Sequence, residues 1–388
     1  MEYTAFDRSW IALAAVDGIG PATMGRILAV TRDPATALKD AEKLAAPCKL
    51  KPKLISAMRL HGTEAWQEGF FGQLELFHIL AIPGYREEYP GRLTALEDAP
   101  MVLFVRGNRE ALETPKALAM VGSRHPSRYG RETALRLAGE LADQGVTVVS
   151  GLARGVDAYS HIGCLNHGGT TVAVLGCGPD ICYPAENREV FSQILETGVV
   201  VSEYAPGVPP DARHFPPRNR IISGLSDGLL VVEAGKRSGT QSTLNFAIAQ
   251  DKALFALPGA IDNELSYLPN QMIRDGAHLT TSAEDVTMVM GWDLLRPGDI
   301  RPYARGYAPP EQQTRMELEP MAEEKVLLEE GQREIYNLIR QGTRSLNRIS
   351  EETGFPIYKV QSDVMMMQLQ GLVRMLSRNE ACIPGKEQ

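Results

Sequence analysis

Short apolar runs alternate with amphipathic helical patterns through the middle of the chain. The runs are rich in β-branched residues and lie at 118–121, 146–149, 171–175, 199–201, 229–232 and 253–257, with 101–105 as a candidate for one more. The helical patterns between them lie at 130–144, 157–166 and 187–197. Continuous apolar strands joined by crossover helices are typical of a parallel sheet covered on both faces. The pattern therefore predicts an α/β domain, which we place at residues 86–291.

The first part of the chain, residues 1–85, has the pattern of a small helical domain. Short helical stretches run from about residue 5 to residue 85, and Pro21 opens one of them directly after a glycine-bounded loop. Proline at the first position of a helix is a start signal. The Gly18-Ile19-Gly20 spacing resembles a helix-hairpin-helix, in which glycine amides at a helix N-terminus approach a DNA phosphate. A tight turn in a small helical domain explains the same spacing equally well.

After the α/β domain the pattern changes twice. Residues 292–328 are rich in proline and charge, a composition that buries too little apolar surface to fold, so we expect a linker there. Beyond it we place a domain at 329–388. Its helical patterns and the start of a small hairpin lie at 332–341, 345–353, 357–369 and 371–376. This order predicts a helix-turn-helix domain of the winged kind.

The charge of the chain is distributed unevenly. Lys and Arg number 40 against 48 Asp and Glu, which gives a formal net charge of −8. Net charge governs solubility and long-range steering, whereas binding to a nucleic acid depends on local clusters of cations. Acidic residues concentrate between 317 and 330, while residues 122–136 have Glu132 as their one acid and carry four arginines. These are Arg124, Arg128, Arg131 and Arg136. The overall sign therefore does not exclude an anionic ligand.

The cytoplasm is the predicted compartment. The start of the chain has acidic residues and lacks the basic-then-apolar pattern of a signal peptide, and no apolar run reaches the roughly 18 residues needed to span a bilayer. Five cysteines are scattered along the chain, and Cys177 and Cys182 lack a second pair of metal ligands. We therefore expect reduced thiols, and neither disulfides nor a metal site.

Glycine-rich loops follow four of the predicted strands, and three of these loops carry a cation. In an open parallel sheet, ligands bind beyond the carboxyl ends of the strands. Glycine lets the backbone approach a ligand, the amides of a following helix favour an anion, and arginine can hold two phosphate oxygens at once. The loops are Gly122-Ser123-Arg124, Gly151-Leu152-Ala153-Arg154-Gly155, Gly176-Cys177-Gly178 and Glu233-Ala234-Gly235-Lys236-Arg237-Ser238-Gly239-Thr240. Arg218-Asn219-Arg220, just ahead of the strand at 228–232, adds two more cations. Together they predict a phosphate-rich ligand.

The type of phosphate ligand follows from the motifs that the chain lacks. Neither the G-x-G-x-x-G of dinucleotide-binding sheets nor the G-x-x-x-x-G-K-[ST] of nucleotide-binding loops is present. Separate cationic loops fit a chain of phosphates, meaning a single nucleic-acid strand, better than one pyrophosphate. Aromatic residues near these loops are candidates for stacking on bases, although each is also typical of a core or loop-anchoring side chain. They are Phe215, Tyr129, Tyr159 and Tyr183.

Titratable residues near the loops allow a catalytic alternative. Asp157 and His161 are four residues apart on a predicted helix, so they share a face and could form a general-base couple. We favour Asp157 as a cap or loop brace and His161 as a hydrogen-bond partner. Glu203 and Glu233 follow strands, and we expect them to brace Arg218 or Arg220 and not to bind a metal. We expect neither a catalytic residue nor a cofactor.

Long ordered motifs between about residues 93 and 290 resemble the DNA processing protein A family (DprA, also called Smf). They are VGSRHPSRYG, VVSGLARGVDAYSH, GGTTVAVLGCGPDICYPAEN, SEYAPG, HFPPRNRIISGLSDGLLVVEA, RSGTQSTLNFA and LFALPG. The resemblance implies an extended Rossmann-like parallel sheet, flanked by a helical N-terminal domain of the sterile-alpha-motif or helix-hairpin-helix type and by a C-terminal winged-helix domain.

The resemblance also implies a function. It implies a non-enzymatic protein that binds and protects incoming single-stranded DNA and loads the recombinase RecA onto it during natural transformation and homologous recombination. A homodimer through the Rossmann domain is expected, with single-stranded DNA-binding protein as a further candidate partner and no membrane contact. The family's phosphate-binding pocket, together with Lys236 from the loop analysis, would comprise Gly122, Ser123, Arg124, Gly151, Arg154, Arg218, Asn219, Arg220, Lys236, Arg237, Ser238 and Gly239.

The chain departs from the family pattern in two places. Gln241 and Ser242 are more polar than the family's usual residues at these positions, which affects how that helix packs. The candidate recognition helix at 357–370 carries Lys359 against Asp363, whereas a helix that enters a major groove normally brings more cations. We therefore expect the C-terminal domain to contact protein in preference to duplex DNA.

An enzyme on the same sheet is the alternative. Lysine-decarboxylase-like nucleoside-monophosphate phosphoribohydrolases use a P-G-G-x-G-T-x-x-E loop, and the position of its catalytic glutamate is occupied here by Thr243. The sequence thus lacks the acid that this chemistry requires. A dinucleotide-dependent oxidoreductase is disfavoured by the missing glycine fingerprint.

Overall fold

The computed structural model describes residues 2–292, 330–369, 372–377 and 380–382. The chain forms two compact units, Met1–Asp299 and Ile300–Gln388, and each is described by itself. The predicted linker at 292–328 lies, apart from residue 292, outside the described residues.

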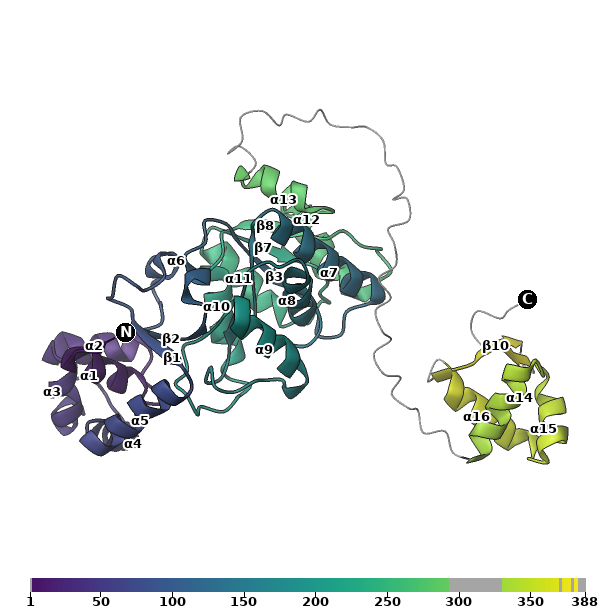
Figure 1. The fold of residues 1–388 in the computed structure, drawn as a ribbon, viewed down its shortest axis with the longest axis horizontal. Helices are drawn as coiled ribbons and strands as arrows, with labels where there is room; N and C mark the ends of the chain where they lie inside the picture. The colour runs from purple at the N-terminus through teal and green to yellow at the C-terminus, as the bar shows by residue number, and fades with distance from the viewer. Residues whose placement is uncertain (1, 293–329, 370–371, 378–379, 383–388) are drawn as a thin grey trace. The chain divides into compact units, whose positions relative to one another are not determined.

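A nine-stranded sheet forms the centre of the first unit (Figure 1). Its order is β1-β2-β6-β5-β4-β3-β7-β8-β9. The strands from β6 to β9 in this order are parallel, whereas β2 is antiparallel to both β1 and β6. Their bounds are Ile79–Pro83, Val102–Gly107, Ala117–Val121, Thr147–Ser150, Thr171–Leu175, Val199–Ser202, Gly228–Val231, Ala253–Ala256 and His278–Leu279 for β1 to β9. The predicted α/β fold with a Rossmann-like parallel sheet is confirmed.

Two strands of this sheet differ from the sequence prediction. β1 lies within the stretch that was predicted to be helical. The prediction was wrong there because the short apolar run of β1 directly follows a long helix and carries no turn signal of its own. β9 has two residues and both side chains are exposed, so it has no apolar run that a pattern search could find. The candidate strand at 101–105 is present as β2, on the antiparallel side of the sheet.

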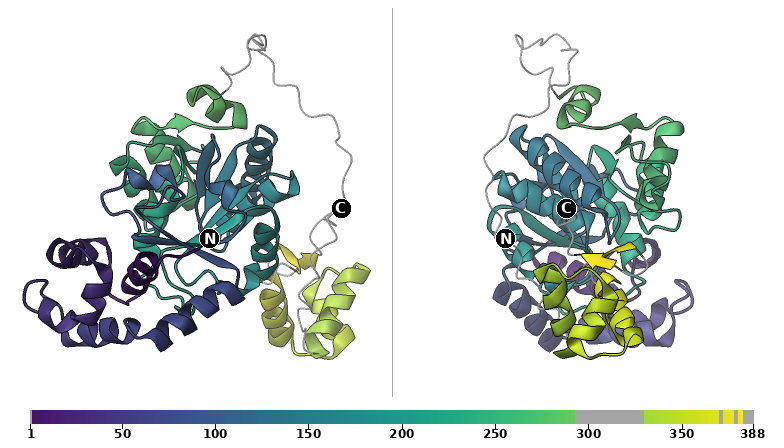
Figure 2. Two further views of the ribbon diagram at one scale, coloured as in Figure 1. Left: turned by 60° about the vertical axis from the view of Figure 1, so that its left-hand side comes forward. Right: turned by 90° about the vertical axis from the view of Figure 1, so that its right-hand side faces the viewer.

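Helices cover both faces of the sheet, and the strand residues alternate between two cores (Figures 1 and 2). Leu118 and Met120 of β3 point to the face covered by α7 (Arg128–Asp143) and α8 (Val156–Asn166). Ala119 of β3 points to the opposite face, which α10, α11 and α12 cover. The bounds of the latter three helices are Phe215–Gly224, Thr240–Ala249 and Tyr267–Arg274. This two-sided burial explains why the strands are continuously apolar.

Shorter elements connect the strands of the first unit. α9 packs against β5 and β6 through Phe191 and Ile194. The other elements in this part of the chain are a short α6 and three 3-10 turns. The bounds are Arg188–Thr197 for α9, Gly91–Thr94 for α6, and Arg109–Leu112, Ala185–Asn187 and Glu264–Ser266 for the three turns.

Five helices at the N-terminus pack around their own core and lie beside β1 (Figure 2, purple). Pro21 occupies the first turn of α2, as predicted. The Gly18–Gly20 turn lines a cavity of about 400 Å³ together with the acidic residues Asp98 and Glu203. Arg220 lines the same cavity and pairs with both carboxylates, and the helix-hairpin-helix role of this turn stays a prediction. The helices are α1 to α5 at Ala5–Ala14, Pro21–Thr31, Pro34–Lys39, Pro52–His61 and Glu64–Leu76, with a 3-10 turn at Ala41–Leu44.

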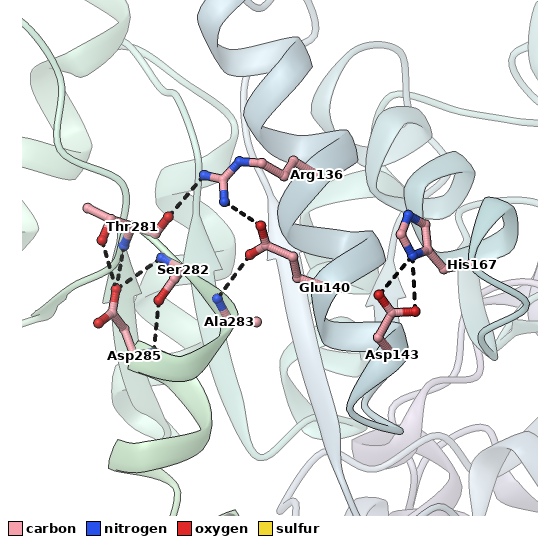
Figure 3. A network of polar contacts seen from close by, with 8 residues as sticks. All are labelled: Arg136, Glu140, Asp143, His167, Thr281, Ser282, Ala283 and Asp285. Atoms are coloured by element: carbon pink, nitrogen blue, oxygen red, sulfur yellow. Dashed lines mark hydrogen bonds and ion pairs between the residues drawn. The ribbon is translucent and has the colours of Figure 1, made fainter. Parts of the chain in front are cut away.

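A polar network attaches α13 (Ala283–Val289) to α7 (Figure 3). Arg136 donates to the carbonyl oxygen of Thr281 (2.9 Å) and pairs with Glu140, which accepts from the amide of Ala283 (3.2 Å). Asp285 closes the capping box at the start of α13. Arg136 is therefore engaged in holding the end of this unit.

The second unit contains three helices and a two-stranded antiparallel sheet. The helices enclose a small apolar core that includes Ile335, Ile349 and Val360. Gly354 adopts φ +70° after α15, which is the left-handed conformation that ends a helix. The bounds are Glu330–Gln341, Leu346–Thr353 and Ile357–Leu369 for α14 to α16, and Arg374–Ser377 and Glu380–Cys382 for β10 and β11. The name winged helix stays a prediction for this unit.

The part of the chain that the structure describes contains no helix that is both long and apolar enough to cross a membrane.

A buried carboxylate links the N-terminal helices to the sheet. Asp7 of α1 accepts hydrogen bonds from Tyr85 (2.5 Å) and from Arg86 Nε (3.0 Å), just after β1, and from the amide of Thr4 (2.8 Å). Burial raises the pKa of Asp7, but the hydrogen bonds from Arg86, Thr4 and Tyr85 outweigh it and lower the pKa below its ordinary value of 3.8.

We predict that Asp7→Asn destabilises the first unit by about 1.5–3 kcal/mol at pH 7, the range for hydrogen bonds to a charged group. Because the folded-state pKa is lowered, this contribution is complete above pH 3.8 and is lost as the pH falls below that value. Urea unfolding of wild type and Asp7→Asn at several pH values measures the difference. A difference that grows as the pH falls would contradict this assignment.

Candidate nucleic-acid interface

A large cavity of the first unit lies where the direction of the sheet reverses. From β3 the chain moves outward through β4, β5 and β6, and then returns to β7 on the other side of β3. The helix after β3 and the helix after β7 cover opposite faces of the sheet. The two loops therefore diverge and leave a space at the carboxyl ends of β3 and β7. This space, with a volume of about 1190 Å³, is called the main cavity below.

Nine of the twelve predicted site residues line the main cavity. They come from three separate segments, the loop after β3, the start of α10 and the loop before α11. They are Gly122, Ser123, Arg124, Arg218, Asn219, Lys236, Arg237, Ser238 and Gly239. The remaining three, Gly151, Arg154 and Arg220, do not line it.

The loop after β3 is held by its backbone. The amide of Ser123 donates to Glu233 O (2.6 Å), and the amide of Val156 donates to Ser123 O (3.0 Å). Gly155 has φ +75°, and a Cβ there would lie 2.3 Å from Ser123 O, so only glycine allows this approach. The tight packing leaves the Arg124 side chain at the cavity wall, with its guanidinium 5.9 Å from the centre of the Phe215 ring.

A buried arginine forms the base of the main cavity. Arg218 Nη1 donates to Gly151 O (2.9 Å) and to Val174 O, at the ends of β4 and β5. Burial lowers the pKa of Arg218 to about 10, and the charge of the nearby Asp157 acts in the opposite direction. Gly151 thus supports the base from outside the cavity. A Cβ at Gly151 would lie 2.5 Å from Arg218 Nη2, which is too close.

Asp157 braces the loop after β4, as predicted. It accepts from the amides of Gly151 (3.2 Å) and Ala153 (3.4 Å). Burial raises its pKa, which the charge of Arg218 partly offsets. His161 Nδ1 instead contacts Thr171 Oγ1 (2.6 Å), and burial lowers the pKa of His161 to about 3. None of the described hydrogen bonds joins Asp157 to His161, so the geometry gives no support to a general-base couple.

Arg220 and Glu203 form a pair away from the main cavity. Arg220 Nη2 lies 2.7 Å from Glu203 Oε1, and its Nε lies 3.0 Å from Asp98. These residues line the cavity next to the N-terminal helices. The predicted brace between Glu203 and Arg220 is confirmed, and it places the Arg220 cation outside the main cavity.

Glu233 differs from its prediction. It accepts from the amide (2.8 Å) and the hydroxyl (2.6 Å) of Ser127, the N-cap of α7, and not from an arginine. The reason is local: Gly130 in the first turn of α7 has no side chain, and the Glu233 carboxylate fills that space. Glu233 therefore fixes the start of α7 against the end of β7.

The loop before α11 presents exposed cations. Lys236 lies 5.7 Å from the centre of the Tyr267 ring, and Arg237 is exposed. Ser238 Oγ accepts from the amide of Thr240 (3.2 Å). The polar Ser242 of α11 is accommodated, since Asn219 Nδ2 donates to it at 3.4 Å.

Aromatic rings line one side of the main cavity. Phe215 and Tyr183 stack with centroids 5.6 Å apart and an angle of 28° between the planes, and both line the cavity. Tyr129 does not line it and donates to Pro258 O (2.9 Å), while Tyr159 lines a neighbouring cavity. Tyr267 also lines the cavity and was not predicted, because no motif marks it in the sequence.

Within the described ranges, no group of three or more His, Cys, Asp or Glu side chains lies close enough together to hold a metal ion.

Fold and site together define a class of protein with a parallel sheet and a cationic, aromatic-lined cavity at its reversal point. The chain belongs to the DNA recombination-mediator protein A family, whose model matches residues 81–291. It is similar to DNA processing protein DprA of Streptococcus pneumoniae, with 42% identity over 198 residues, 51% of this chain and 70% of that protein. It is also similar to protein Smf of Escherichia coli, with 45% identity over 206 residues, 53% of this chain and 55% of that protein.

Two solved structures share this fold. The X-ray structure of DprA from Streptococcus pneumoniae matches with a TM-score of 0.63 and 32% identity, over 74% of this chain and 98% of that one. DprA from Helicobacter pylori, described for its single-stranded DNA binding mode, matches with a TM-score of 0.51 and 29% identity, over 56% of this chain and 97% of that one.

Substitution of Arg218 and of Arg237 should change the stability of the protein to different extents, because Arg218 is buried and Arg237 is exposed. We predict that Arg218→Ala destabilises the protein by about 3–5 kcal/mol, because it leaves the Asp157 carboxylate buried without a counter-charge. Arg237→Ala, at an exposed loop position, should change the unfolding free energy by less than about 0.5 kcal/mol. Denaturant unfolding of both variants measures this, and equal stabilities would contradict the role given to Arg218.

Proposed function

We propose that this protein binds single-stranded DNA through the main cavity and does so without catalysis. One observation carries the proposal: cations from separate loops and stacked aromatic rings line one cavity at the reversal point of the sheet. The described residues that face it include Arg124, Lys236 and Arg237, none with a carboxylate partner among the described ion pairs. A phosphate chain would supply the missing counter-charge.

The size and lining of the cavity favour a strand over a small ligand. Its volume of about 1190 Å³ exceeds the roughly 300–1,000 Å³ of typical small-molecule pockets. Tyr183 is 45% exposed and is backed by Phe215, so a base can stack on its open face. Every base has an aromatic face, and we therefore expect little sequence preference.

The residues at the base of the cavity support a non-catalytic role over phosphoribohydrolase chemistry. Thr243, at the position of that chemistry's catalytic glutamate, is buried and has no acidic group. Asp157 is the carboxylate beside Arg218, and its Oδ2 accepts hydrogen bonds from two backbone amides. An acid held this way positions a loop.

The biological setting belongs to the same proposal. Membership of the family supports protection of incoming DNA and loading of the recombinase RecA onto it during natural transformation. The proposal also includes a homodimer through the Rossmann domain, single-stranded DNA-binding protein as a further partner, and a cytoplasmic location. The helical, α/β, linker and winged-helix domains at 1–85, 86–291, 292–328 and 329–388 are kept as the proposed division of the chain.

The C-terminal unit is proposed to contact protein and not duplex DNA. Lys359, the cation of its candidate recognition helix, lies 4.3 Å from the centre of the Phe355 ring. Lys359 keeps its charge in this contact, but it is the one basic side chain of α16, so the helix brings little positive charge to a phosphate backbone.

We predict that wild-type protein binds a single-stranded oligonucleotide more tightly than the matching duplex. The logarithm of affinity should fall with the logarithm of salt concentration by about 0.7 per neutralised phosphate. Arg237→Ala should weaken binding and flatten that slope, because it removes an exposed cation of the cavity. Fluorescence anisotropy over a salt series measures both quantities.

Two control variants make this test specific. Arg109→Ala removes an arginine between β2 and β3, at the opposite edge of the sheet, and should leave affinity unchanged. Lys359→Ala should likewise change neither single-strand nor duplex affinity. Unchanged single-strand affinity in Arg237→Ala would overturn the assignment of the cavity. Release of ribose 5-phosphate from a nucleoside monophosphate would instead favour the phosphoribohydrolase alternative.

Recombinase loading is tested separately. We expect the protein to shorten the lag before RecA hydrolyses ATP on a strand already coated with single-stranded DNA-binding protein. Arg237→Ala should lose this effect in proportion to its lost affinity. An unchanged lag with wild-type protein, at a concentration that saturates the DNA, would argue against loading.

The proposed homodimer is tested by light scattering of the same preparation. We expect the mass of a dimer, and the mass of a monomer would contradict the proposal.

A further inference from the structure

A second cavity lies next to the main cavity and shares Arg124 with it. It has a volume of about 560 Å³ and is formed by the loop before α7, the start of α8 and Glu186. Arginines dominate its polar lining. They are Arg124, Arg128, Arg131 and Arg154, and Glu186 is the one acidic residue among the lining side chains that the structure describes.

Two of these arginines have no acidic partner. Arg131 is exposed on α7, and neither it nor Arg124 takes part in an ion pair within the described ranges of the chain. Arg136, the fourth arginine of the cluster noted in the sequence, is engaged by Glu140 and Thr281 instead (Figure 3). The structure thus divides the sequence cluster: Arg136 holds α13, and the other three arginines face the second cavity.

The other two arginines are held by weak partners. Arg128 pairs with Glu132 at 2.7 Å, with side chains 83% and 55% exposed. Arg154 forms a bidentate pair with Glu186, from Nε to Oε1 and from Nη2 to Oε2 (2.8 Å), and these side chains are 53% and 51% exposed. Exposed ion pairs contribute roughly 0–1 kcal/mol, with bidentate pairs at the upper end, so a phosphate displaces Glu132 more easily than it displaces Glu186.

The backbone brings the two cavities together at Arg124. Gly155 precedes α8, and a Cβ at this position would lie 2.7 Å from the carbonyl carbon of Arg124. The absence of a side chain lets the start of α8 lie directly against the Gly122-Ser123-Arg124 loop. Arg124 consequently stands at the boundary, with the main cavity on one side and Arg154 and Arg131 on the other.

We propose that the second cavity holds the phosphates of the same DNA strand where it leaves the main cavity, and that Glu186 weakens binding there by competing for Arg154. This inference rests on the proposed function, since it extends the path of the strand. A strand that continues past Arg124 meets Arg154 and Arg131 next, whereas a strand too short to pass Arg124 does not reach them.

The test compares two lengths of DNA. A phosphorylated thymidine dinucleotide should occupy only the main cavity, and a thymidine oligonucleotide of about 12 residues should reach both. Arg131→Ala should weaken binding of the longer strand by about two- to fivefold and make its salt slope shallower by about 0.7, with no change for the dinucleotide. Glu186→Gln should tighten binding of the longer strand alone. Arg109→Ala serves as the matched arginine control, and anisotropy or calorimetry gives the affinities.

The outcomes separate this inference from the proposed function. Arg237→Ala should weaken binding at both lengths; if it changes neither, the main cavity is wrongly assigned. Arg237→Ala could weaken binding while Arg131→Ala and Glu186→Gln leave the affinity for the longer strand unchanged. In that case the second cavity does not lie on the path of the strand, and an acidic peptide would be the better candidate ligand. Equal losses at both lengths in Arg131→Ala would also overturn the inference. Unchanged dinucleotide affinity in Arg131→Ala confirms that the variant is folded.

Discussion

The reversal of strand order around β3 is the constraint on which the rest of the site depends. Because β4 and β7 flank the same strand and their connections leave toward opposite faces, the loops after β3 and β7 meet at Ser123 and Glu233 and diverge beyond that point. A gap remains at the carboxyl edge, and α10 and the loop before α11 complete its wall. Three cationic segments that are far apart in the sequence thereby surround one space.

Charge is distributed in two layers around this space. Arg218 is buried, donates to two carbonyl groups at the strand ends and neutralises Asp157. Arg124, Lys236 and Arg237 are nearer the surface and have no acidic partner in the described ion pairs. The inner layer shapes the cavity and the outer layer carries the net positive charge. This explains how a chain with a net charge of −8 presents a surface suited to phosphate.

The sequence predicted the parallel sheet and most of the cavity, because both depend on local patterns. Apolar runs mark buried strands, and glycine with arginine after a strand marks a ligand loop. It could not distinguish Arg218 and Arg220, which are buried, from Arg237, which is exposed, since burial depends on distant partners such as Gly151 and Glu203. β9 and Tyr267 were missed for the same reason, as neither has a local signal.

The position of Glu233 has a thermodynamic consequence. Its side chain holds the N-cap of α7 while its backbone carbonyl holds Ser123, so one residue fixes both ends of the loop between β3 and α7. Loops fixed in this way lose little conformational entropy when a ligand arrives. The ordering cost of association then falls on the DNA. A flexible pyrimidine strand, which has little base stacking to give up, would meet this rigid surface at a slightly lower cost than a well-stacked purine strand, a modest difference on top of stacking contacts that accept any base.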